Sequence, residues 1–244
     1  HHSDWTPAQK SRYLTENSQA AKRLLLRTCG YGIPNSQRVL HCMRNRVSLI
    51  AQETIQPYRL DGTRGTMNEM CIFQLPWPKE TLFAMAEKSV HLRVTLSYFI
   101  EPSPAKRGWT NRYRYASHGL RFDLRRLNES HEAFNKRVNV AMRDADDEID
   151  APDDSNWLLG DKLRRHGSIH SDQWSGMAID LAERDLIAIH PVVGWWRERI
   201  NRGRCETQTR FSLVVSLETE DNTVDLYNEI KKQIEIPMAL ELEK

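Results

Sequence analysis

A histidine, a serine and an aspartate stand side by side in the stretch GSIHSDQWSG, residues 167–176, as His170, Ser171 and Asp172, with Ser175 just beyond. These are the three residue types of a serine hydrolase. A catalytic triad needs the serine hydroxyl on one imidazole nitrogen and a carboxylate on the other, so it is defined by spatial roles rather than by adjacency in sequence. On a strand, Ser171 would point to the face opposite His170 and Asp172, and on a helix immediate neighbours do not face each other. The spacing therefore argues against a catalytic centre here.

A second cluster of the same residue types occurs in YASHGLRFD, as Ser117, His118 and Asp123. Ser117 and His118 again alternate faces on a strand, and no Gly-x-Ser-x-Gly turn surrounds the serine. We expect a strand whose polar side chains form hydrogen bonds in a half-buried sheet, with Gly119 at a bulge. An independent hydrolase built on one of these two clusters is the third-ranked interpretation.

Two tryptophans followed by arginines occur in VVGWWRERINRGR, residues 192–204. Stacking rings beside cationic side chains are typical of single-stranded nucleic-acid binding. The formal net charge is only +2, from 35 Lys and Arg against 33 Asp and Glu, so a nucleic-acid partner is not expected. The favoured interpretation is a strand end with one tryptophan in the core and solvated arginines after it. A stand-alone binding module for nucleic acid or protein, using residues 195–204, is the alternative, and its binding surface would be Trp195, Trp196, Arg197, Arg199 and Arg204.

Metal and cofactor sites are not indicated. The acidic run DADDEIDAPDD, residues 144–154, lacks the glycine and the closing glutamate of an EF-hand loop, so we expect a solvated loop. None of the four cysteines forms a CxxC pair, which favours buried, reduced thiols over a zinc site or a disulfide framework. We therefore predict no catalytic residue, no metal and no cofactor. The cysteines are Cys29, Cys42, Cys71 and Cys205.

The composition is that of an ordinary soluble protein. The chain has 244 residues, of which 39% are hydrophobic and 28% are charged, enough to bury a sizeable core. It contains no apolar run long enough to span a bilayer and does not open with a secretory hydrophobic region, so a cytoplasmic location is expected.

From Val47 onward the hydrophobic period is two, as in β-strands. The clearest strand covers residues 90–101, with Leu92, Val94, Leu96 and Tyr98 on one face, and we expect it to be central. Helices are expected over 129–142, with Phe134 and Val138 on the apolar side, and over 225–234. Many short strands joined by turns predict a mainly β fold, an antiparallel β-sandwich or jelly-roll-like domain with a few helices. The other expected strands cover residues 47–60, 67–75, 111–125, 167–174, 186–196 and 209–219.

The first 45 residues have a helical pattern instead. Thr6 is suited to cap a helix that begins at Pro7, and Gly30 and Gly32 end the helical segment that follows. A short helix is expected to restart at Pro34, with Val39, Leu40 and Met43 on one face. The expected organisation is a helical segment over residues 1–45 and a β domain over residues 46–244.

The helical segment carries a family resemblance. HSDWTP, followed by GYGIPNSQRVL with its G-x-G-x-x-N turn at Gly30, Gly32 and Asn35, resembles the end of the α/β catalytic domain of subtilisin-like serine proteases. VTLSYFIEPSP, YRYASHGLRF, GSIHSDQWSG and RFSLVVSLET look like the C-terminal region of one bacterial subgroup of these subtilases. Members of that subgroup are large intracellular proteases, often encoded beside an AAA-type ATPase.

The resemblance implies a fragment without the catalytic triad. The family's nucleophile lies in a Gly-Thr-Ser motif, which this sequence lacks; DGTRGT at 61–66 has no serine. We therefore expect a non-catalytic accessory domain that stabilises or positions the protease domain and contributes to substrate or partner recognition. The partners that follow are the protease domain of the same parent chain and, by family resemblance, an AAA-type ATPase. We expect residues 1–45 to dock on the β domain, or on a second copy of the chain to form a dimer, or else to be poorly ordered.

Overall fold

The structure is a computed structural model that describes residues 42–61, 64–99, 119–143, 156–160, 164, 168–191 and 207–235. Within these residues the chain is mainly β, with antiparallel sheets and a few helices. The strands are β1 (Cys42–Met43), β2 (Arg46–Ile55), β3 (Tyr58–Asp61), β4 (Arg64–Met67), β5 (Cys71–Gln74), β6 (Ser89–Tyr98), β7 (Leu120–Leu124), β8 (Ile169–Met177), β9 (Leu186–Pro191) and β10 (Thr209–Thr219). The helices are α4 (Lys79–Ala84), α5 (His131–Arg143), α7 (Ala178–Ala182) and α8 (Leu226–Glu235).

Five strands form the larger sheet, in the order β1-β2-β10-β6-β8. Strand β6 lies inside this sheet, between β10 and β8, and both pairings are antiparallel. Its alternating pattern buries one face, because Leu92, Val94 and Leu96 are fully buried and Tyr98 nearly so. The predicted central strand and its core-facing residues are confirmed.

Strand β10 occupies the middle of the larger sheet although it comes late in the sequence. It pairs with β2 on one side, from Thr209 opposite Ile55 to Glu218 opposite Arg46, and with β6 on the other. Its apolar side chains at alternate positions, Phe211, Leu213, Val215 and Leu217, are buried in the same cluster as the apolar side chains of β6.

Three strands form the smaller sheet, in the order β5-β9-β7. All six residues of β9 are buried. Ile187 and Ile189 join the cluster that also contains the apolar face of the larger sheet, while Leu186 and Ala188 belong to a second, smaller cluster with α5. Strand β9 is thus covered on both faces, which accounts for its continuous apolar run LIAI.

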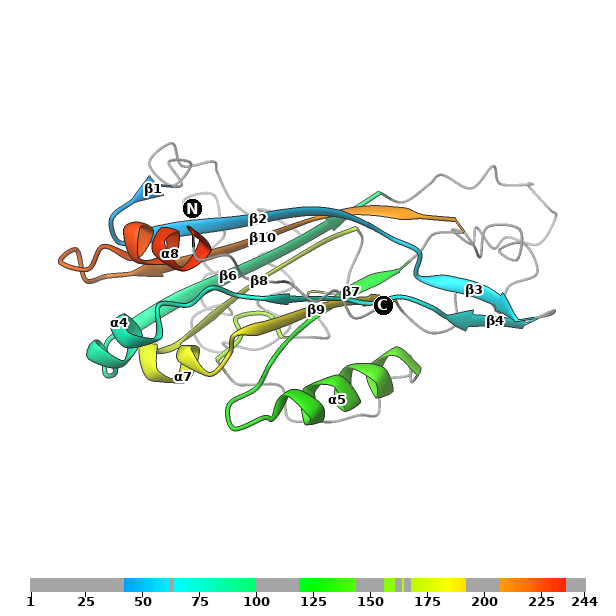
Figure 1. The fold of residues 1–244 in the computed structure, drawn as a ribbon, viewed down its shortest axis with the longest axis horizontal. Helices are drawn as coiled ribbons and strands as arrows, with labels where there is room; N and C mark the ends of the chain where they lie inside the picture. Colours follow the sequence, from blue (N-terminus) through cyan, green and yellow to red (C-terminus); the bar gives the residue numbers. More distant parts are fainter. Residues whose placement is uncertain are drawn as a thin grey trace, which may run out of the picture.

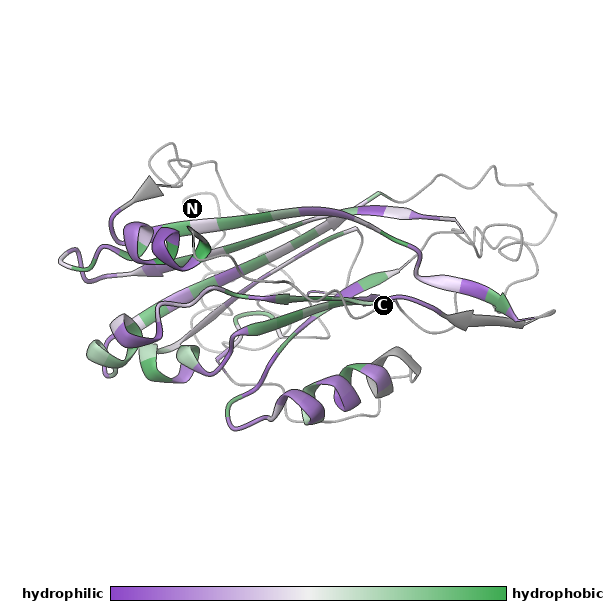
Figure 2. Cartoon of the chain, in the orientation of Figure 1, coloured by the Kyte–Doolittle hydropathy of each residue, from purple (hydrophilic) through white to green (hydrophobic). Residues whose placement is uncertain are grey.

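Helix α5 lies along the smaller sheet (Figure 1). Ser130 begins the helix, since its Oγ accepts the backbone N–H of Ala133 at 3.1 Å. Phe134 and Val138, one turn apart, are fully buried against Leu186 and Ala188, as predicted for this helix. In Figure 2, α5 carries both hydrophilic and hydrophobic residues, as expected of a helix that covers a sheet on one side and faces solvent on the other.

The remaining helices lie at one end of the sheets, and the β3–β4 hairpin extends at the other (Figure 1). The predicted C-terminal helix is present as α8, whose Leu226 and Ile230 reach the main core. Helices α4 and α7 were not predicted, because each has six residues or fewer and is too short for a clear helical period.

One local prediction was wrong. Cys42 and Met43, expected at the end of a helix, form β1 and pair with Val47 and Arg46, so the predicted boundary at residue 45 falls in the turn of a β-hairpin. Gly119 immediately precedes β7, and the rest of the strand predicted before it, residues 111–118, lies outside the described residues. The helices expected over residues 1–41 lie outside the described residues. None of the helices in the described part is long and apolar enough to cross a membrane.

Candidate functional site

Strand β8 places Ser171 away from His170 and Asp172. The side chains of His170 and Asp172 are buried on the core side of the larger sheet. Ser171 lies on the outer side, where its Oγ is 2.9 Å from Oγ1 of Thr95 on β6. The predicted alternation of faces is therefore confirmed, and these three residues do not form a triad.

The Asp172 carboxylate organises the backbone of the neighbouring segment. Its two oxygens accept hydrogen bonds from the backbone N–H groups of Leu159 at 2.9 Å, Gly160 at 3.0 Å and Gln173 at 2.8 Å. The Nη1 atom of Arg164 lies 3.5 Å from Oδ2 of Asp172. Burial raises the pKa of Asp172, and the hydrogen bonds and Arg164 oppose that rise without cancelling it. The carboxylate thus holds the backbone of Leu159 and Gly160 and the side chain of Arg164 beside strand β8.

Arg164 is buried beside Asp172 among aromatic rings. Its guanidinium carbon lies 4.5 Å from the ring centre of Phe122 and 4.9 Å from that of Trp157. Arginine stacks on aromatic faces and pairs with carboxylates, and this site uses both properties. The Asp172–Arg164 pair is therefore a buried polar element that contacts β8 of the larger sheet and, through Phe122, β7 of the smaller sheet.

Trp174, two residues after Asp172 on β8, is fully buried and depends on a glycine. A Cβ atom on Gly176 would overlap the six-membered ring of the Trp174 indole. We expect Gly176→Ala to lower the free energy of unfolding by about 1–3 kcal/mol, because the rigid ring cannot move away without disturbing the core. Urea unfolding measures the change. Trp174→Leu should abolish the penalty of Gly176→Ala in a double-mutant cycle, and an unchanged penalty would contradict the overlap.

The structure does bring one serine to a histidine, by cross-strand pairing. Ser175 lies opposite His91 of β6, with 2.9 Å between the serine Oγ and the histidine Nδ1. Glu220, just after β10, lies 3.9 Å from Nε2 of His91, and its side chain is 85% exposed. Sequence reasoning missed this contact, because it arises from the register of two paired strands and joins residues 84 positions apart in the sequence.

The Ser175–His91 contact lacks the surroundings of a nucleophile. The distance to Glu220 exceeds that of a hydrogen bond, so the carboxylate does not orient the ring. The backbone N–H of Ser175 donates to the carbonyl of Asn156 at 3.0 Å, so it is not available to stabilise an oxyanion.

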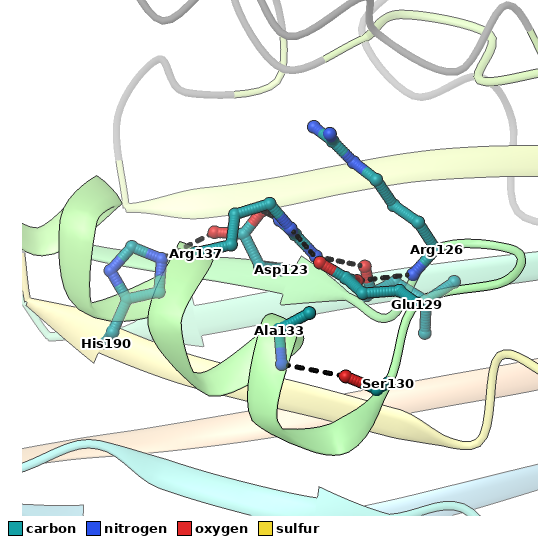
Figure 3. Close-up of polar contacts among 8 residues, drawn as sticks. Asp123, Arg126, Glu129, Ser130, Ala133, Arg137 and His190 are labelled. Atoms are coloured by element: carbon teal, nitrogen blue, oxygen red, sulfur yellow. Dashed lines mark hydrogen bonds and ion pairs between the residues drawn. The ribbon is translucent and has the colours of Figure 1, made fainter.

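Asp123, from the second predicted cluster, pairs with a histidine that sequence reasoning did not select. His190 of β9 lies with its Nε2 2.7 Å from Oδ2 of Asp123 (Figure 3). Ser117 and His118 lie outside the described residues. His190 is fully buried, and its Nδ1 is 3.0 Å from the carbonyl oxygen of Pro191. Since both ring nitrogens face acceptors, this imidazole has no nitrogen left to take a proton from a serine.

Arg137 of α5 joins the helix to Asp123. Its guanidinium donates to Oδ1 of Asp123 at 3.1 Å, to the carbonyl of Leu124 at 3.0 Å and to both carboxylate oxygens of Glu129, at 2.7 and 3.0 Å (Figure 3). Glu129 also accepts the backbone N–H of Arg126 at 2.9 Å. This bidentate pair and its two further bonds clamp α5 to β7.

The charges of the clamp determine the pKa values of its acids. Burial alone would raise the pKa of Asp123, but the hydrogen bond from His190 and the positive charges of His190, Arg137 and Arg164 outweigh it and hold the pKa well below its usual range. Burial alone would also raise the pKa of Glu129, but the hydrogen bonds from Arg137 outweigh that effect and lower the pKa. Both carboxylates are therefore charged near neutral pH.

Two features of the sequence indicate the buried contacts of this clamp. His190 is the one polar residue in the apolar run LIAIHP, and a polar group in a fully buried strand requires a partner. Arg137 lies three residues after Phe134 and one before Val138, so it borders the apolar stripe of α5. Each position indicated a buried polar contact, although the sequence did not identify the partner residue in either case.

The other predicted sites are only partly covered by the structure. The proposed binding surface of Trp195, Trp196, Arg197, Arg199 and Arg204 and the acidic run lie outside the described residues. Among the residues that are described, no group of three or more His, Cys, Asp and Glu could hold a metal ion. Cys71 has a free thiol, and burial, with the negative charges of Glu53 and Glu69, raises its pKa to about 11. That thiol is therefore a poor nucleophile at neutral pH.

Comparison with known proteins gives no relative for this arrangement. No family model, no curated protein and no solved structure matches the chain.

Proposed function

We propose that this chain is a non-catalytic accessory domain of a subtilisin-like serine protease, which stabilises or positions the protease domain of the same parent. In this proposal the larger and smaller sheets are the two layers of a β-sandwich. The support is that apolar faces of both sheets contribute to one hydrophobic cluster. The segments that resemble the subtilase C-terminal region overlap β6, β7, β8 and β10, all of which belong to these two sheets.

One observation carries the non-catalytic part of the proposal: the buried acids of both candidate clusters are occupied by structural donors. Asp172 accepts three backbone N–H groups, and Asp123 is bound by His190 and Arg137. A catalytic acid must instead orient a histidine whose second nitrogen reaches the nucleophile.

We expect the purified chain to have no serine hydrolase activity. A fluorophosphonate probe should leave the chain unlabelled, and peptide and casein substrates should remain uncleaved. A serine hydrolase labelled in the same tube controls for probe activity, and Ser175→Ala controls for the serine that contacts His91 in the described part of the chain. Stoichiometric labelling of Ser117, Ser171 or Ser175 would contradict the proposal.

The positioning role is tested in the longer parent. The parent should be expressed with and without residues 47–244, and its thermal unfolding and proteolytic rate compared. We expect the truncated parent to unfold at lower temperature and to cleave more slowly, and the intact parent carrying Gly176→Ala to fall between the two. Equal stability and activity with and without the domain would contradict the proposal.

The alternative, a stand-alone nucleic-acid- or protein-binding module, depends on residues 195–204. A salt-dependent titration with oligonucleotides distinguishes it, since phosphate contacts give a steep decrease of affinity with salt.

A further inference from the structure

Helices α4 and α7 lie next to each other at one end of the sheets and carry exposed apolar side chains (Figures 1 and 2). Phe83 of α4 is 53% exposed, Ile179 of α7 is 43% exposed, and Met177, just before α7, is 54% exposed. Backbone hydrogen bonds join the two helices, since Ile179 donates to the carbonyl of Ala86 and Ala86 donates to the carbonyl of Phe83, both at 3.3 Å. Apolar side chains gathered on one surface indicate an interaction site. We call Phe83, Met177 and Ile179 the end patch.

Three carboxylates border the end patch. They belong to Glu80 of α4, Glu87 in the turn after α4, and Asp180 of α7. In the part of the chain that the structure describes, none of the three is paired with a cation. The lysines that flank α4, Lys79 and Lys88, each contact an acid outside this group, at 2.9 and 3.9 Å. The end patch therefore favours an occupant that is apolar and positively charged.

One segment of this chain has that composition. Residues 20–27, AAKRLLLR, contain three leucines and three cations, and the sequence has no Asp or Glu between Glu16 and Glu53. With a helical period, the two alanines share one face with Leu24 and Leu25, and the cations share the other. The segment matches the end patch both in apolar character and in charge.

The segment is also attached at the correct end of the molecule. The register of the larger sheet places the β1–β2 turn and the end of β8 at the same end (Figure 1). Strands β1 and β8 are the two edges of this sheet, which at about 4.8 Å per spacing is about 20 Å wide. Residues 28–41, which lead to Cys42, span up to about 45 Å when extended. By contrast, the basic residues 197–204 lead into β10 at the far end, where Thr209 is opposite Ile55.

We propose that residues 20–27 bind the end patch of the same chain, with the leucines on its apolar side chains and the cations beside its acidic border. The contact fastens the N-terminal segment across the end of the larger sheet and removes apolar surface from water. It concerns this chain alone and does not depend on the protease relationship. In the proposed parent, where residues 1–45 end the protease domain, the end patch is the face that holds that domain.

Photo-cross-linking of the full chain tests where the segment binds. Phe83 is replaced by p-benzoylphenylalanine, which keeps an aromatic side chain at this position, and mass spectrometry identifies the peptides joined by irradiation. We expect products with residues 20–27 that migrate at the monomer mass. Products of dimer mass, products with residues 192–204 instead, or no product would overturn the proposal. The same replacement at Leu158, also 53% exposed but beside Gln173 of β8, is the matched control and should not give this product.

The charge match is tested in the same assay by reversing each side. Glu80→Lys with Glu87→Lys should lower the cross-link yield about threefold or more, because the segment then meets like charges. Both glutamates are exposed, so these substitutions leave the core unchanged. Adding Lys22→Glu and Arg23→Glu to this variant should restore the yield. A yield that the first reversal leaves unchanged, or that the second does not restore, would show that charge does not select this segment.

Discussion

Asp172→Ala should lower the free energy of unfolding by about 3–5 kcal/mol, the largest effect that we expect from a single polar substitution in this chain. The carboxylate is lost, but Arg164 stays buried between Phe122 and Trp157, and the N–H groups of Leu159 and Gly160 lose their acceptor. A buried charge without its partner costs more than the pair itself contributes. For a domain with a total stability of about 5–15 kcal/mol, the midpoint of urea unfolding would move markedly.

Two controls separate this mechanism from a general disturbance of β8. Gln173→Ala changes the next side chain, which lies on the outer face, and should alter stability by about 0.5 kcal/mol or less. Adding Arg164→Met to Asp172→Ala should restore part of the loss, because an apolar side chain then replaces the orphaned cation. If the double variant is no more stable than Asp172→Ala, the buried arginine is not the source of the cost.

Arg137→Ala should remove about 2–4 kcal/mol of unfolding free energy at pH 7, concentrated in α5. The substitution breaks four hydrogen bonds and leaves Asp123 and Glu129 close together without the cation between them. Arg137→Lys keeps the charge but cannot make the bidentate contact, so it should lose an intermediate amount. Lys136→Ala, at the exposed neighbouring position, is the matched control and should change stability little.

The effect of Arg137→Ala should depend on pH in a defined direction. The pKa values of Asp123 and Glu129 are lowered in the folded protein, so their stabilising contribution is present above the unfolded carboxyl pKa of about 4 and is lost as the pH falls below it. The difference between Arg137→Ala and the unaltered chain should therefore shrink from pH 7 toward pH 3. A constant difference over that range would show that the clamp is not ionic.

The strands with clear alternation were predictable because burial on one face leaves a period of two in the sequence. This holds for β6, where Leu92, Val94 and Leu96 mark the buried face, and for β10. The same alternation predicted that Ser171 lies on the opposite face of its strand from His170 and Asp172. The position of α5 was also predictable, since Phe134 and Val138 lie one turn apart.

The polar contacts were not predictable to the same degree, because they depend on strand order and register. Asp123 meets His190 only because β7 pairs with β9, and His91 meets Ser175 only because β6 pairs with β8. No local pattern specifies either pairing. The short helices α4 and α7 were missed for a different reason, since each has six residues or fewer and shows no clear helical period.

The central place of β10 has a consequence for how the chain acquires its structure during synthesis. Glu218 pairs with Arg46, so the two partners are 218 − 46 = 172 residues apart. At a translation rate of about 5–20 residues per second, β2 and β6 leave the ribosome many seconds before the strand that joins them. During that interval their apolar faces and unpaired backbone edges are exposed to aggregation or to chaperones. Completion of the larger sheet therefore waits for β10, the last strand in the described part of the chain, and slowing translation before residue 209 would prolong the vulnerable nascent state.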